Sequence, residues 1–439
     1  MRRRPLAFLA RLSAGRRRVL YGGAAALAAA SFYVGASTVP SGGGETRSHG
    51  ANLWIDPDGG GCDREAARGE YRDAAACGSA QDAYAAASCG DVVRYRPGAG
   101  YGSLTIASGA KSCGASGRIV FAPEDDAPNT LARQSTVVIA RIEIQVSDCW
   151  CEIRDIDTFS GATTGGTVEV DGGDGPPVSA DVVLRRIDTR TFWLPARDVE
   201  IHGGSAGGFN ACSDGDGGLQ DAVQIWQSGN PAQPPRDILI DGIYIHDMGA
   251  TATCDDHSDA IQMLCGTNIT IRNSRFVNGP DEDIIGRPFR CPLENIVIEN
   301  NMLGTTGGYQ NITIGNGDVC SNIVIRNNSA AESVNLSCSA GGSDNRHYNN
   351  IASNCIIENA ASSNNVHTGT VGCGTNARHC TPTYAHANHA TTADQHLAAN
   401  DTCAKDHGTP DAPKHDYDGD PRPPDNTTIG ADEPESEAD

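Results

Sequence analysis

Acidic side chains gather in one short stretch of the second half of the chain, between residues 255 and 290. Asp259 and Asp283 each open a similar pattern, Asp-Ala-Ile-Gln and Asp-Ile-Ile-Gly. If the two patterns lie in register on neighbouring strands, their carboxyl groups are ~4.8 Å apart. Carboxylates that close repel each other unless they share a proton, bind a cation or face an arginine. This pair is therefore the first candidate for chemistry.

A calcium ion is one way to hold such carboxylates together, because Ca²⁺ prefers several hard oxygen ligands. The stretch offers six acidic side chains as ligands: Asp255, Asp256, Asp259, Asp281, Glu282 and Asp283. The sequence thus favours Ca²⁺ as a bound ion and indicates no other cofactor.

The same stretch allows two kinds of catalysis on a polysaccharide. A retaining glycosidase needs two carboxyl groups ~5 Å apart, the roles open to Asp259 and Asp283. A lyase acting on uronates needs a cation or an arginine to neutralise the substrate carboxylate, and a base. His257, Arg287 and Arg290 are the candidate bases, because the stretch contains no lysine.

A purely structural role competes with both. Asp221, Asp259 and Asp283 open similar segments, where they would cap strand starts and pair with arginines. The chemical and the structural interpretation both stay open at this point.

A repeat shows which elements must position these residues. Segments such as Asn295-Ile-Val-Ile-Glu-Asn300 recur at intervals of 27 to 32 residues between residues 237 and 359. Each alternates apolar and mixed positions with period two, which is typical of a short strand. In register, one inward column holds Ile238, Ile269, Ile296, Ile323 and Cys355, and the next holds Ile240, Ile271, Ile298, Ile325 and Ile357.

Asparagines frame these strands at both ends. Asparagine tolerates left-handed backbone and can bond its copy one strand away. We expect one ladder of Asn268, Asn295, Asn322 and Asn354, and a second of Asn273, Asn300, Asn327 and Asn359.

A second strand column precedes the first, at Asp221, Asp259, Asp283 and, more loosely, Gln310, with weaker copies around Asp181 and Asp198. Strands this short bury their faces only by stacking into an array. A turn of about 24 to 31 residues, with two visible strands and room for a third, describes an all-β fold, the right-handed parallel β-helix.

These segments resemble the pectate-lyase-like β-helix superfamily over most of residues 51–372. The resemblance implies a short helix that caps the open end of the stack, and residues 81–87 are helix-prone. It also implies a carbohydrate ligand, although the Arg-Ile-Lys and Gly-His-Gly signatures of polygalacturonase-type enzymes are absent. Residues 416–422 and 429–433 are similar to the closing segment of many uncharacterised exported β-helix proteins.

The N-terminus has the pattern of an export signal. Seven arginines within residues 1–18 precede an uncharged Ala/Gly/Leu-rich run at 19–37. This order is typical of a signal peptide, and the run is also just long enough for a single membrane anchor. Either way the chain beyond about residue 40 is expected outside the cell, secreted or anchored.

The 16 cysteines all lie after residue 60. An even count without any CxxC pair favours disulfides over metal clusters. Cys149 and Cys151 would share one face of a strand, so each is expected to bond a neighbouring segment. Six histidines crowd the C-terminal section among cysteines; a disulfide-tied polar cap is favoured there over a zinc site, because the spacings match no zinc pattern.

Composition and charge narrow the function. A formal charge of −22 argues against nucleic acid as a partner. Candidates for stacking on sugar rings are Trp150, Trp193, Trp226 and Tyr309. The expected organisation is a basic region at 1–18, a signal or anchor at 19–37, a linker at 38–50, an N-terminal cap and first coils at 51–130, the β-helix at 131–372, a Cys/His-rich section at 373–433 and an acidic tail at 434–439.

Two functions follow from these features. One is an exported enzyme, a calcium-assisted polysaccharide lyase or a glycosidase; the other is a non-catalytic, monomeric rod that binds a glycan or another partner at the cell envelope. The acidic exterior repels uronate polymers unless a cation bridges them, whereas a neutral glycan needs no such ion.

Overall fold

The computed structural model describes residues 50–96, 100–124, 137–158, 166–170, 179–210, 221–226, 234–249, 258–279, 281–289, 291–306, 310–339 and 344–434. The chain divides into two units, Met1–Ser48 and His49–Asp439, and every described residue belongs to the second. The expected signal or anchor at 19–37 lies outside the described residues. None of the described helices is long and apolar enough to cross a membrane.

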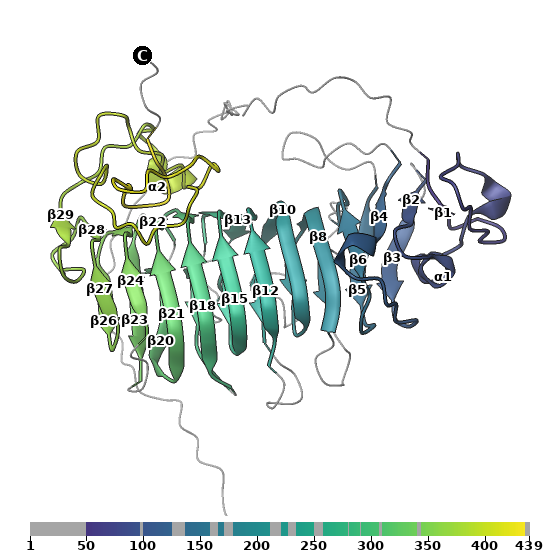
Figure 1. Cartoon of the computed structure of the whole chain (residues 1–439), viewed down its shortest axis with the longest axis horizontal. Helices are drawn as coiled ribbons and strands as arrows, with labels where there is room; N and C mark the ends of the chain where they lie inside the picture. Colours follow the sequence, from purple (N-terminus) through teal and green to yellow (C-terminus); the bar gives the residue numbers. More distant parts are fainter. Residues whose placement is uncertain are drawn as a thin grey trace, which may run out of the picture. The chain divides into compact units, whose positions relative to one another are not determined.

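The strands of the second unit stack side by side into a parallel β-solenoid (Figure 1). They form one 19-stranded and one 10-stranded sheet, and every ladder between two named strands in the described ranges is parallel. The long strand β10 (Arg197–Asn210) pairs with β12 through residues 197–202 and with β13 through residues 205–210. It therefore turns a corner, and the larger sheet supplies two of the three faces.

The first face contains the strands β1 (Leu53–Ile55), β2 (Val92–Tyr95), β4 (Ile119–Pro123), β6 (Cys151–Arg154), β8 (Ser179–Thr189), β10, β12 (Arg236–Asp241), β15 (Gly266–Arg272), β18 (Leu293–Glu299), β21 (Cys320–Arg326), β24 (Arg346–Tyr348) and β27 (Ala361–Ser363). The second face continues from β8 and β10 through β13 (Tyr244–Gly249), β16 (Arg275–Val277), β19 (Met302–Leu303), β22 (Ser329–Ala330), β25 (Ile351–Ala352), β28 (Val366–His367) and β29 (Arg378–His379).

The third face is the 10-stranded sheet. Its strands are β3 (Tyr101–Ile106), β5 (Ile139–Ile144), β7 (Thr167–Val170), β9 (Thr191–Trp193), β11 (Val223–Ile225), β14 (Ile261–Met263), β17 (Glu282–Gly286), β20 (Gln310–Asp318), β23 (Ser333–Cys338) and β26 (Cys355–Glu358). Three strands per coil agree with the sequence expectation of two visible strands and room for a third.

The isoleucine columns of the first face are confirmed over four coils. Ile238, Ile269, Ile296 and Ile323 pair in register, and so do Ile240, Ile271, Ile298 and Ile325. All eight side chains are buried. Stacking thus buries the apolar face that a single strand would leave in water.

The fifth repeat, residues 354–359, was assigned to the wrong face. Cys355 pairs with Val334 in the 10-stranded sheet, whereas Ile325 pairs with His347 on the first face. The reason is coil length: the Asn-Asn corners at 327–328, 349–350 and 364–365 are only 22 and then 15 residues apart. An alignment that assumes a constant repeat length therefore no longer matches the strands at the C-terminal end.

The weaker copies around Asp181 and Asp198 also belong to a different column from the one expected. Val182 pairs with Val199, and Val199 pairs with Ile238, which places all three on the first face. Asp181 and Asp198 both have φ near +50°, like the asparagines that open the later strands. Aspartate and asparagine share this corner because both tolerate left-handed backbone.

The first expected asparagine ladder is present except for its last member, whereas the second is present only between Asn273 and Asn300, because Asn327 donates to Thr428 and Gly430 of the C-terminal section. Asn268, Asn295 and Asn322 each donate to the side chain of the preceding coil over 2.7–2.9 Å, starting at Asp237. Asn300 bonds Asn273 in the same way over 3.3 Å. The expected last members, Asn354 and Asn359, do not continue these ladders: Asn354 donates to Ser353 and Asn359 to the carbonyl oxygen of Cys338.

A third, fully buried ladder has no counterpart in the sequence-based expectation. It consists of the second residue of each Asn-Asn corner: Asn301, Asn328, Asn350 and Asn365. The Oδ1 atom of each accepts the backbone N–H of its equivalent in the preceding coil, over 2.8–3.1 Å. The ladder satisfies main-chain donors that the corner would otherwise bury without partners.

At the N-terminal end, helix α1 (Ala80–Ala86) forms where the sequence is helix-prone. Ser79 begins it, because its hydroxyl oxygen accepts the backbone N–H of Asp82. Tyr84 of this helix is buried and donates to the carbonyl oxygen of Cys149. A strand, β1, precedes this helix and pairs with β2.

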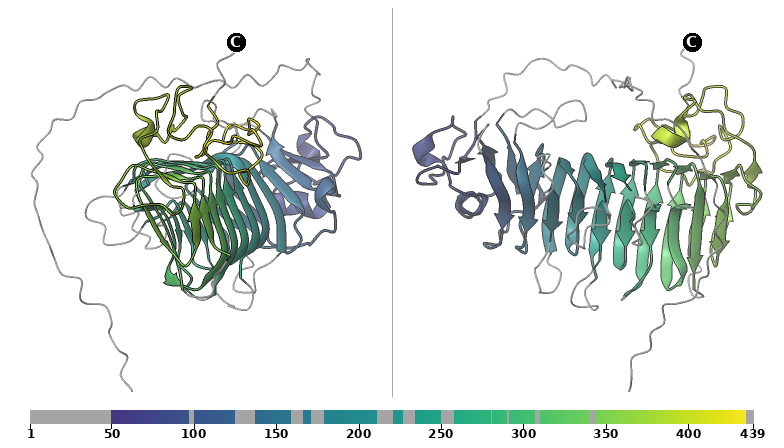
Figure 2. Two further views of the ribbon diagram at one scale, coloured as in Figure 1. Left: turned by 60° about the vertical axis from the view of Figure 1, so that its left-hand side comes forward. Right: turned by 180° about the vertical axis from the view of Figure 1, so that it is seen from behind.

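The C-terminal section, residues 373–433, contains the short strand β29 and one short helix, α2 (His389–Thr392). It lies beside the corners of the late coils that carry the asparagines (Figures 1 and 2). The amide of Asn327 donates to the carbonyl oxygens of Thr428 and Gly430. The buried guanidinium of Arg422 reaches Asn300 Oδ1 and pairs with Glu433. Asn300 and Asn327 thus also anchor this section to the solenoid.

Seven disulfides join described cysteines: Cys62–Cys77, Cys89–Cys113, Cys149–Cys151, Cys265–Cys291, Cys320–Cys338, Cys355–Cys373 and Cys380–Cys403. The expectation that Cys149 and Cys151 bond other segments was wrong. Trp150 between them has φ +47° and lies just before β6, which begins at Cys151, so the two cysteines are not on one face of a strand and bond each other. So many disulfides point to an oxidising, extracellular environment.

Candidate functional site

A column of buried polar side chains lines the corner that leads into the 10-stranded sheet. Asp221, Asp259, Asp283 and Asn311 stand just before or at the start of β11, β14, β17 and β20 and are at most 1% exposed. The structure therefore brings the two expected catalytic aspartates, Asp259 and Asp283, onto neighbouring coils. Neither carboxyl group presents a surface that a polymer could contact.

The carboxylates of this column bond the backbone of the next coil. Asp221 Oδ1 accepts the N–H of Asp259 over 2.7 Å, and Asp259 Oδ1 accepts the N–H of Glu282 over 3.3 Å. Asn311 continues the pattern: its Oδ1 accepts the N–H of Glu332 over 2.6 Å. These contacts are those of a structural ladder that supports strand starts.

Asp283 differs from its neighbours in the origin of its side-chain donor, which comes from the next coil, whereas Asp221 and Asp259 accept glutamine amides of their own coils. Asn311 Nδ2 donates to Asp283 Oδ2 over 2.7 Å. Burial raises the pKa of the Asp283 carboxyl well above its usual value, and the charges of Glu332 and Asp259 add to this effect against the Asn311 bond. The column thus lowers its internal repulsion by favouring a protonated Asp283.

The register between the two aspartate patterns is one residue away from the expected alignment. Ile261 pairs with Ile284 and not with Ile285. Ala260 separates Asp259 from the first inward residue of its strand, whereas Asp283 precedes Ile284 directly. The corner before β17 is therefore one residue shorter than the corner before β14.

The remaining site residues fall into two groups. Asp255, Asp256, His257 and Arg290 lie outside the described residues. Asp281 Oδ2 accepts the N–H of Ser258 over 3.0 Å, and Glu282 lies 3.8 Å from the half-exposed guanidinium of Arg287. The expected calcium site and the expected catalytic roles stay predictions.

The outward side of the 10-stranded sheet carries a different set of groups. Trp193, Gln224 and Gln262 pair in register on β9, β11 and β14, and all three are partly exposed. Trp226 comes two residues after Gln224, where the ladder still continues, so it points to the same side. We call these four residues, Trp193, Gln224, Trp226 and Gln262, the tryptophan face.

The buried aspartates orient the glutamines of the tryptophan face. Asp221 Oδ2 accepts the side-chain amide of Gln224 over 2.7 Å, and Asp259 Oδ2 accepts that of Gln262 over 3.3 Å. Each bond uses only one of the two N–H groups of the amide. The sequence signal was the pattern Asp-Ala-Val-Gln and Asp-Ala-Ile-Gln, whose fourth residue sequence reasoning had left without a role.

The indole Nε1–H groups of Trp193 and Trp226 are buried, and neither has a hydrogen-bond partner within the described ranges, so the indoles contribute ring surface to this face and no accessible donor. Both residues had been named from sequence as candidates for stacking on sugars. Of the other two, Trp150 lies 5.8 Å from the Arg118 guanidinium, and Tyr309 is outside the described residues.

The tryptophan face has limits at both ends. The same column continues through Ile285, Thr313 and Asn335 on one side, all of them buried, and through the buried Glu169 on the other. The accessible part therefore spans the three coils from β9 to β14, about 10 Å at one strand spacing per coil.

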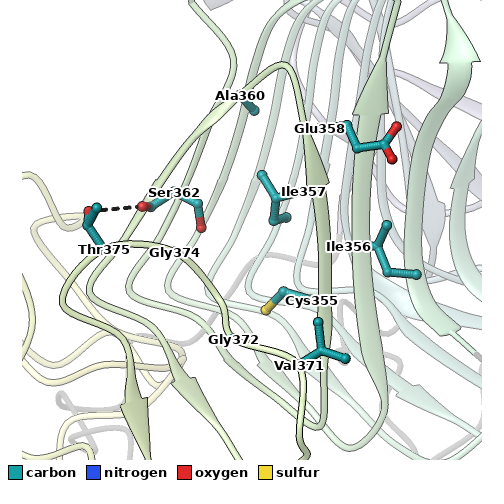
Figure 3. Close-up of a pocket in the computed structure, with 10 residues that line it drawn as sticks. All are labelled: Cys355, Ile356, Ile357, Glu358, Ala360, Ser362, Val371, Gly372, Gly374 and Thr375. Carbon is teal, nitrogen blue, oxygen red and sulfur yellow. Dashed lines mark hydrogen bonds between the residues drawn. The ribbon is translucent and has the colours of Figure 1, made fainter.

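A shallow cavity of about 670 Å³ lies elsewhere, at the C-terminal end of the stack (Figure 3). The last strand of the third face, β26, lines it together with Ser362 and the segment 371–375. Its side chains are mostly small or apolar, with Glu358 as the one carboxylate among those that line it. Glu358 already accepts a hydrogen bond from Ser337, so the cavity offers little for catalysis.

Comparisons with known proteins give no relative: no family model matches the chain, and no curated protein or solved structure matches it significantly.

Proposed function

We propose that this chain is an exported β-solenoid that binds a neutral polysaccharide along the tryptophan face. The observation that carries the proposal is the run Trp193, Gln224 and Gln262 on three successive coils, with Trp226 beside it. Indoles offer flat apolar surface for sugar rings, and carboxamides offer paired donors and acceptors for hydroxyl groups.

The proposal includes the finer parts of the sequence expectation. The solenoid is right-handed, as parallel crossovers nearly always are, and belongs to the pectate-lyase-like superfamily, with α1 as the N-terminal cap. Residues 19–37 direct export as a signal or an anchor, which fits the seven disulfides. The chain acts as a monomeric rod.

Charge supports a neutral glycan over a polyanion. None of the four residues of the tryptophan face is ionisable, whereas the chain as a whole carries a formal charge of −22. A uronate polymer would meet a repulsive field and no cation on this face. Binding should therefore persist in the presence of a chelator.

The test is a binding titration of the purified chain with neutral and acidic polysaccharides, with calcium and with chelator. Trp193→Ala and Gln224→Ala should each weaken binding of a neutral glycan at least tenfold, about 1.4 kcal/mol. Ile356→Ala is the matched control, because Ile356 is the outward residue of the same column on β26, well away from this face. Undiminished binding by the Trp193→Ala/Gln224→Ala variant, or binding restricted to acidic polymers, would refute the proposal.

The same incubations distinguish binding from catalysis. Unsaturated product that disappears with chelator would establish a calcium-dependent lyase, and new reducing ends alone would establish a glycosidase. If either activity is lost in the Asp259→Asn/Asp283→Asn variant, the catalytic site lies in the acidic stretch at residues 255–290. Binding without either product is the result we expect.

A further inference from the structure

Three side chains of the C-terminal section converge in a cluster that the glycan proposal does not use. His396, Asp418 and Asp432 each offer one ligand atom, and these atoms all lie within 4.8 Å of one another. His396 Nε2 is 2.8 Å from Asp418 Oδ2. We call these three residues the His396 cluster.

The backbone around the cluster is fixed on all three segments. Gln395 is buried and donates to the carbonyl oxygen of Leu303 in the solenoid. The N–H of Leu397 donates to Asp432 Oδ2 over 2.8 Å. Asp416 Oδ1 accepts the N–H groups of Asp418 and Asp420, which holds the turn that presents Asp418. The three ligand groups are therefore positioned before any ion arrives.

The tautomer of His396 is set from its other side. Asp394 Oδ1 lies 2.5 Å from His396 Nδ1. A carboxylate at this position fixes the imidazole ring and directs the lone pair of Nε2 toward the remaining ligands, as it does for histidines that bind metals.

Negative charge exceeds positive charge around the cluster. Asp432 and Asp416 are 4% and 2% exposed, while Asp418 and Asp394 are partly exposed. The buried cation Arg422 is engaged by Glu433 and by backbone carbonyl oxygens. Buried carboxylates need a compensating cation.

We propose that the His396 cluster binds one divalent transition-metal ion of the zinc type through His396 Nε2 and the carboxylates of Asp418 and Asp432. One nitrogen and two oxygen ligands suit zinc, whereas calcium prefers oxygen ligands alone. Three protein ligands leave a fourth position for water. The ion would cross-link the segments around residues 396, 418 and 432 close to where the C-terminal section meets the solenoid.

The competing arrangement is a proton in place of the metal. A protonated His396 between Asp394 and Asp418 forms two charge-assisted hydrogen bonds and needs no ion. A metal must displace the proton on Nε2, so metal uptake and proton release are coupled. A surface histidine without such carboxylate partners is expected to release less proton when it binds zinc.

The test is calorimetric titration of the chelator-treated chain with Zn²⁺, Mn²⁺ and Ca²⁺. We expect uptake of one Zn²⁺ per chain, tighter than Ca²⁺, with proton release seen as a dependence of the heat on the buffer. His396→Gln and Asp418→Asn should each weaken Zn²⁺ binding at least tenfold. Asp420→Asn and His379→Gln are the matched controls, because both residues are exposed and lie outside the cluster.

A second measurement guards against variants that fail to fold. Zn²⁺ should raise the melting temperature of the unaltered chain and of the two controls, but not of Asp418→Asn. Absence of saturable uptake, or equal losses in cluster and control variants, would overturn the proposal. Neither result bears on the tryptophan face, so the two proposals fail independently.

Discussion

The side-chain amide of Gln224 donates a 2.7 Å hydrogen bond to the buried carboxylate of Asp221, three residues before it. Gln262 and Asp259 repeat the arrangement one coil further on. A buried structural column and an exposed polar face are thus connected through single side chains. Substitutions of the buried aspartates are therefore expected to change the orientation of the glutamines on the tryptophan face.

Asp221→Asn tests this connection. Asparagine keeps one acceptor oxygen, which cannot serve both the N–H of Asp259 and the amide of Gln224. We expect a loss of about 1–2 kcal/mol in the free energy of unfolding and a several-fold loss in glycan affinity. Denaturant unfolding and a binding titration measure the two effects.

A double-mutant cycle separates the contributions of Asp221 and Gln224. If Asp221 acts on the glycan through Gln224, Asp221→Asn should weaken binding no further once Gln224→Ala is present. Additive losses of affinity would show that Asp221 affects binding by another route.

Asp283→Asn should stabilise the chain at neutral pH. Because burial raises the folded-state pKa of Asp283 above the unfolded value of 3.8, folding is favoured by a protonated carboxyl. This contribution is complete below pH 3.8 and is lost as the pH rises through the folded pKa. The asparagine variant carries no charge, so its melting temperature should exceed that of the unaltered chain at pH 7 and the difference should shrink toward pH 4.

The control for Asp283 is Glu294→Gln, which removes a partly exposed carboxylate from β18. Its melting temperature should follow that of the unaltered chain across this range. A lower melting temperature for Asp283→Asn at pH 7 would mean that the ionised carboxylate has a role, as in the calcium prediction.

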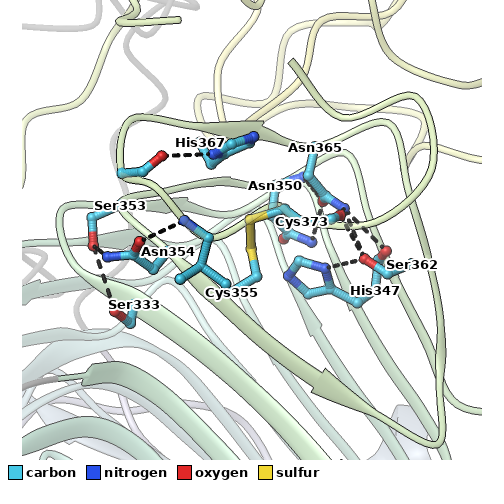
Figure 4. The surroundings of a disulfide bond; sticks show 12 residues. Ser333, His347, Asn350, Ser353, Asn354, Cys355, Ser362, Asn365, His367 and Cys373 are labelled. Atoms are coloured by element: carbon cyan, nitrogen blue, oxygen red, sulfur yellow. Dashed lines mark hydrogen bonds between the residues drawn. A yellow bond between two sulfur atoms is a disulfide. The ribbon is translucent and has the colours of Figure 1, made fainter. Parts of the chain in front are cut away.

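His347 should make the chain sensitive to acid. It is fully buried in the column that begins with Ile240, with Nδ1 3.2 Å from the Ser362 hydroxyl (Figure 4). Burial lowers its pKa from 6.5 to about 3. The unfolded chain therefore binds a proton as the pH falls below 6.5, and stability declines down to about pH 3, by roughly 5 kcal/mol in all.

His347→Leu continues the apolar column and removes this titration. Its free energy of unfolding should change much less between pH 6.5 and pH 4 than that of the unaltered chain. His379→Gln, which removes an exposed histidine, should leave the dependence intact. Equal slopes for all three proteins would place the acid sensitivity elsewhere.

The buried and the exposed ladders should differ in their energetic importance. Asn328 accepts the backbone N–H and the side-chain amide of Asn301 and donates to the carbonyl oxygen of Ile298. Asn328→Ala removes these three buried hydrogen bonds and should cost about 2–4 kcal/mol. Asn295→Asp, in the exposed ladder, keeps a residue type that tolerates the left-handed backbone and should cost less than about 1 kcal/mol, as measured by denaturant unfolding.

The sequence predicts the parts of this fold that repeat at constant length. Ile238 to Ile323 follow a period that stacking requires, and Asn268, Asn295 and Asn322 recur because a left-handed corner excludes most other residues. The prediction failed where coil length changed. Cys355 lies on another face because the last coils are shorter than the earlier ones. The asparagine corners keep their geometry when a coil is shortened, so the local sequence pattern does not reveal the change in coil length.

The candidate site was predictable only in part. Asp259 and Asp283 were recognised from residue type and spacing, but burial decides whether a carboxylate supports a strand or meets a ligand. Gln224 and Gln262 carry no chemical signature on their own and gain one only beside Trp193 in the folded sheet. The His396 cluster likewise joins segments whose spacing matches no ligand pattern.

Three disulfides, Cys265–Cys291, Cys320–Cys338 and Cys355–Cys373, each enclose about one coil. A protease that cuts once between the two cysteines of such a pair leaves both products covalently joined. The parallel ladders on either side of the cut also hold the ends in place. For a protein exposed to extracellular proteases, a nick in one of these coils would leave the rod whole, and the cleavage would be seen only after reduction.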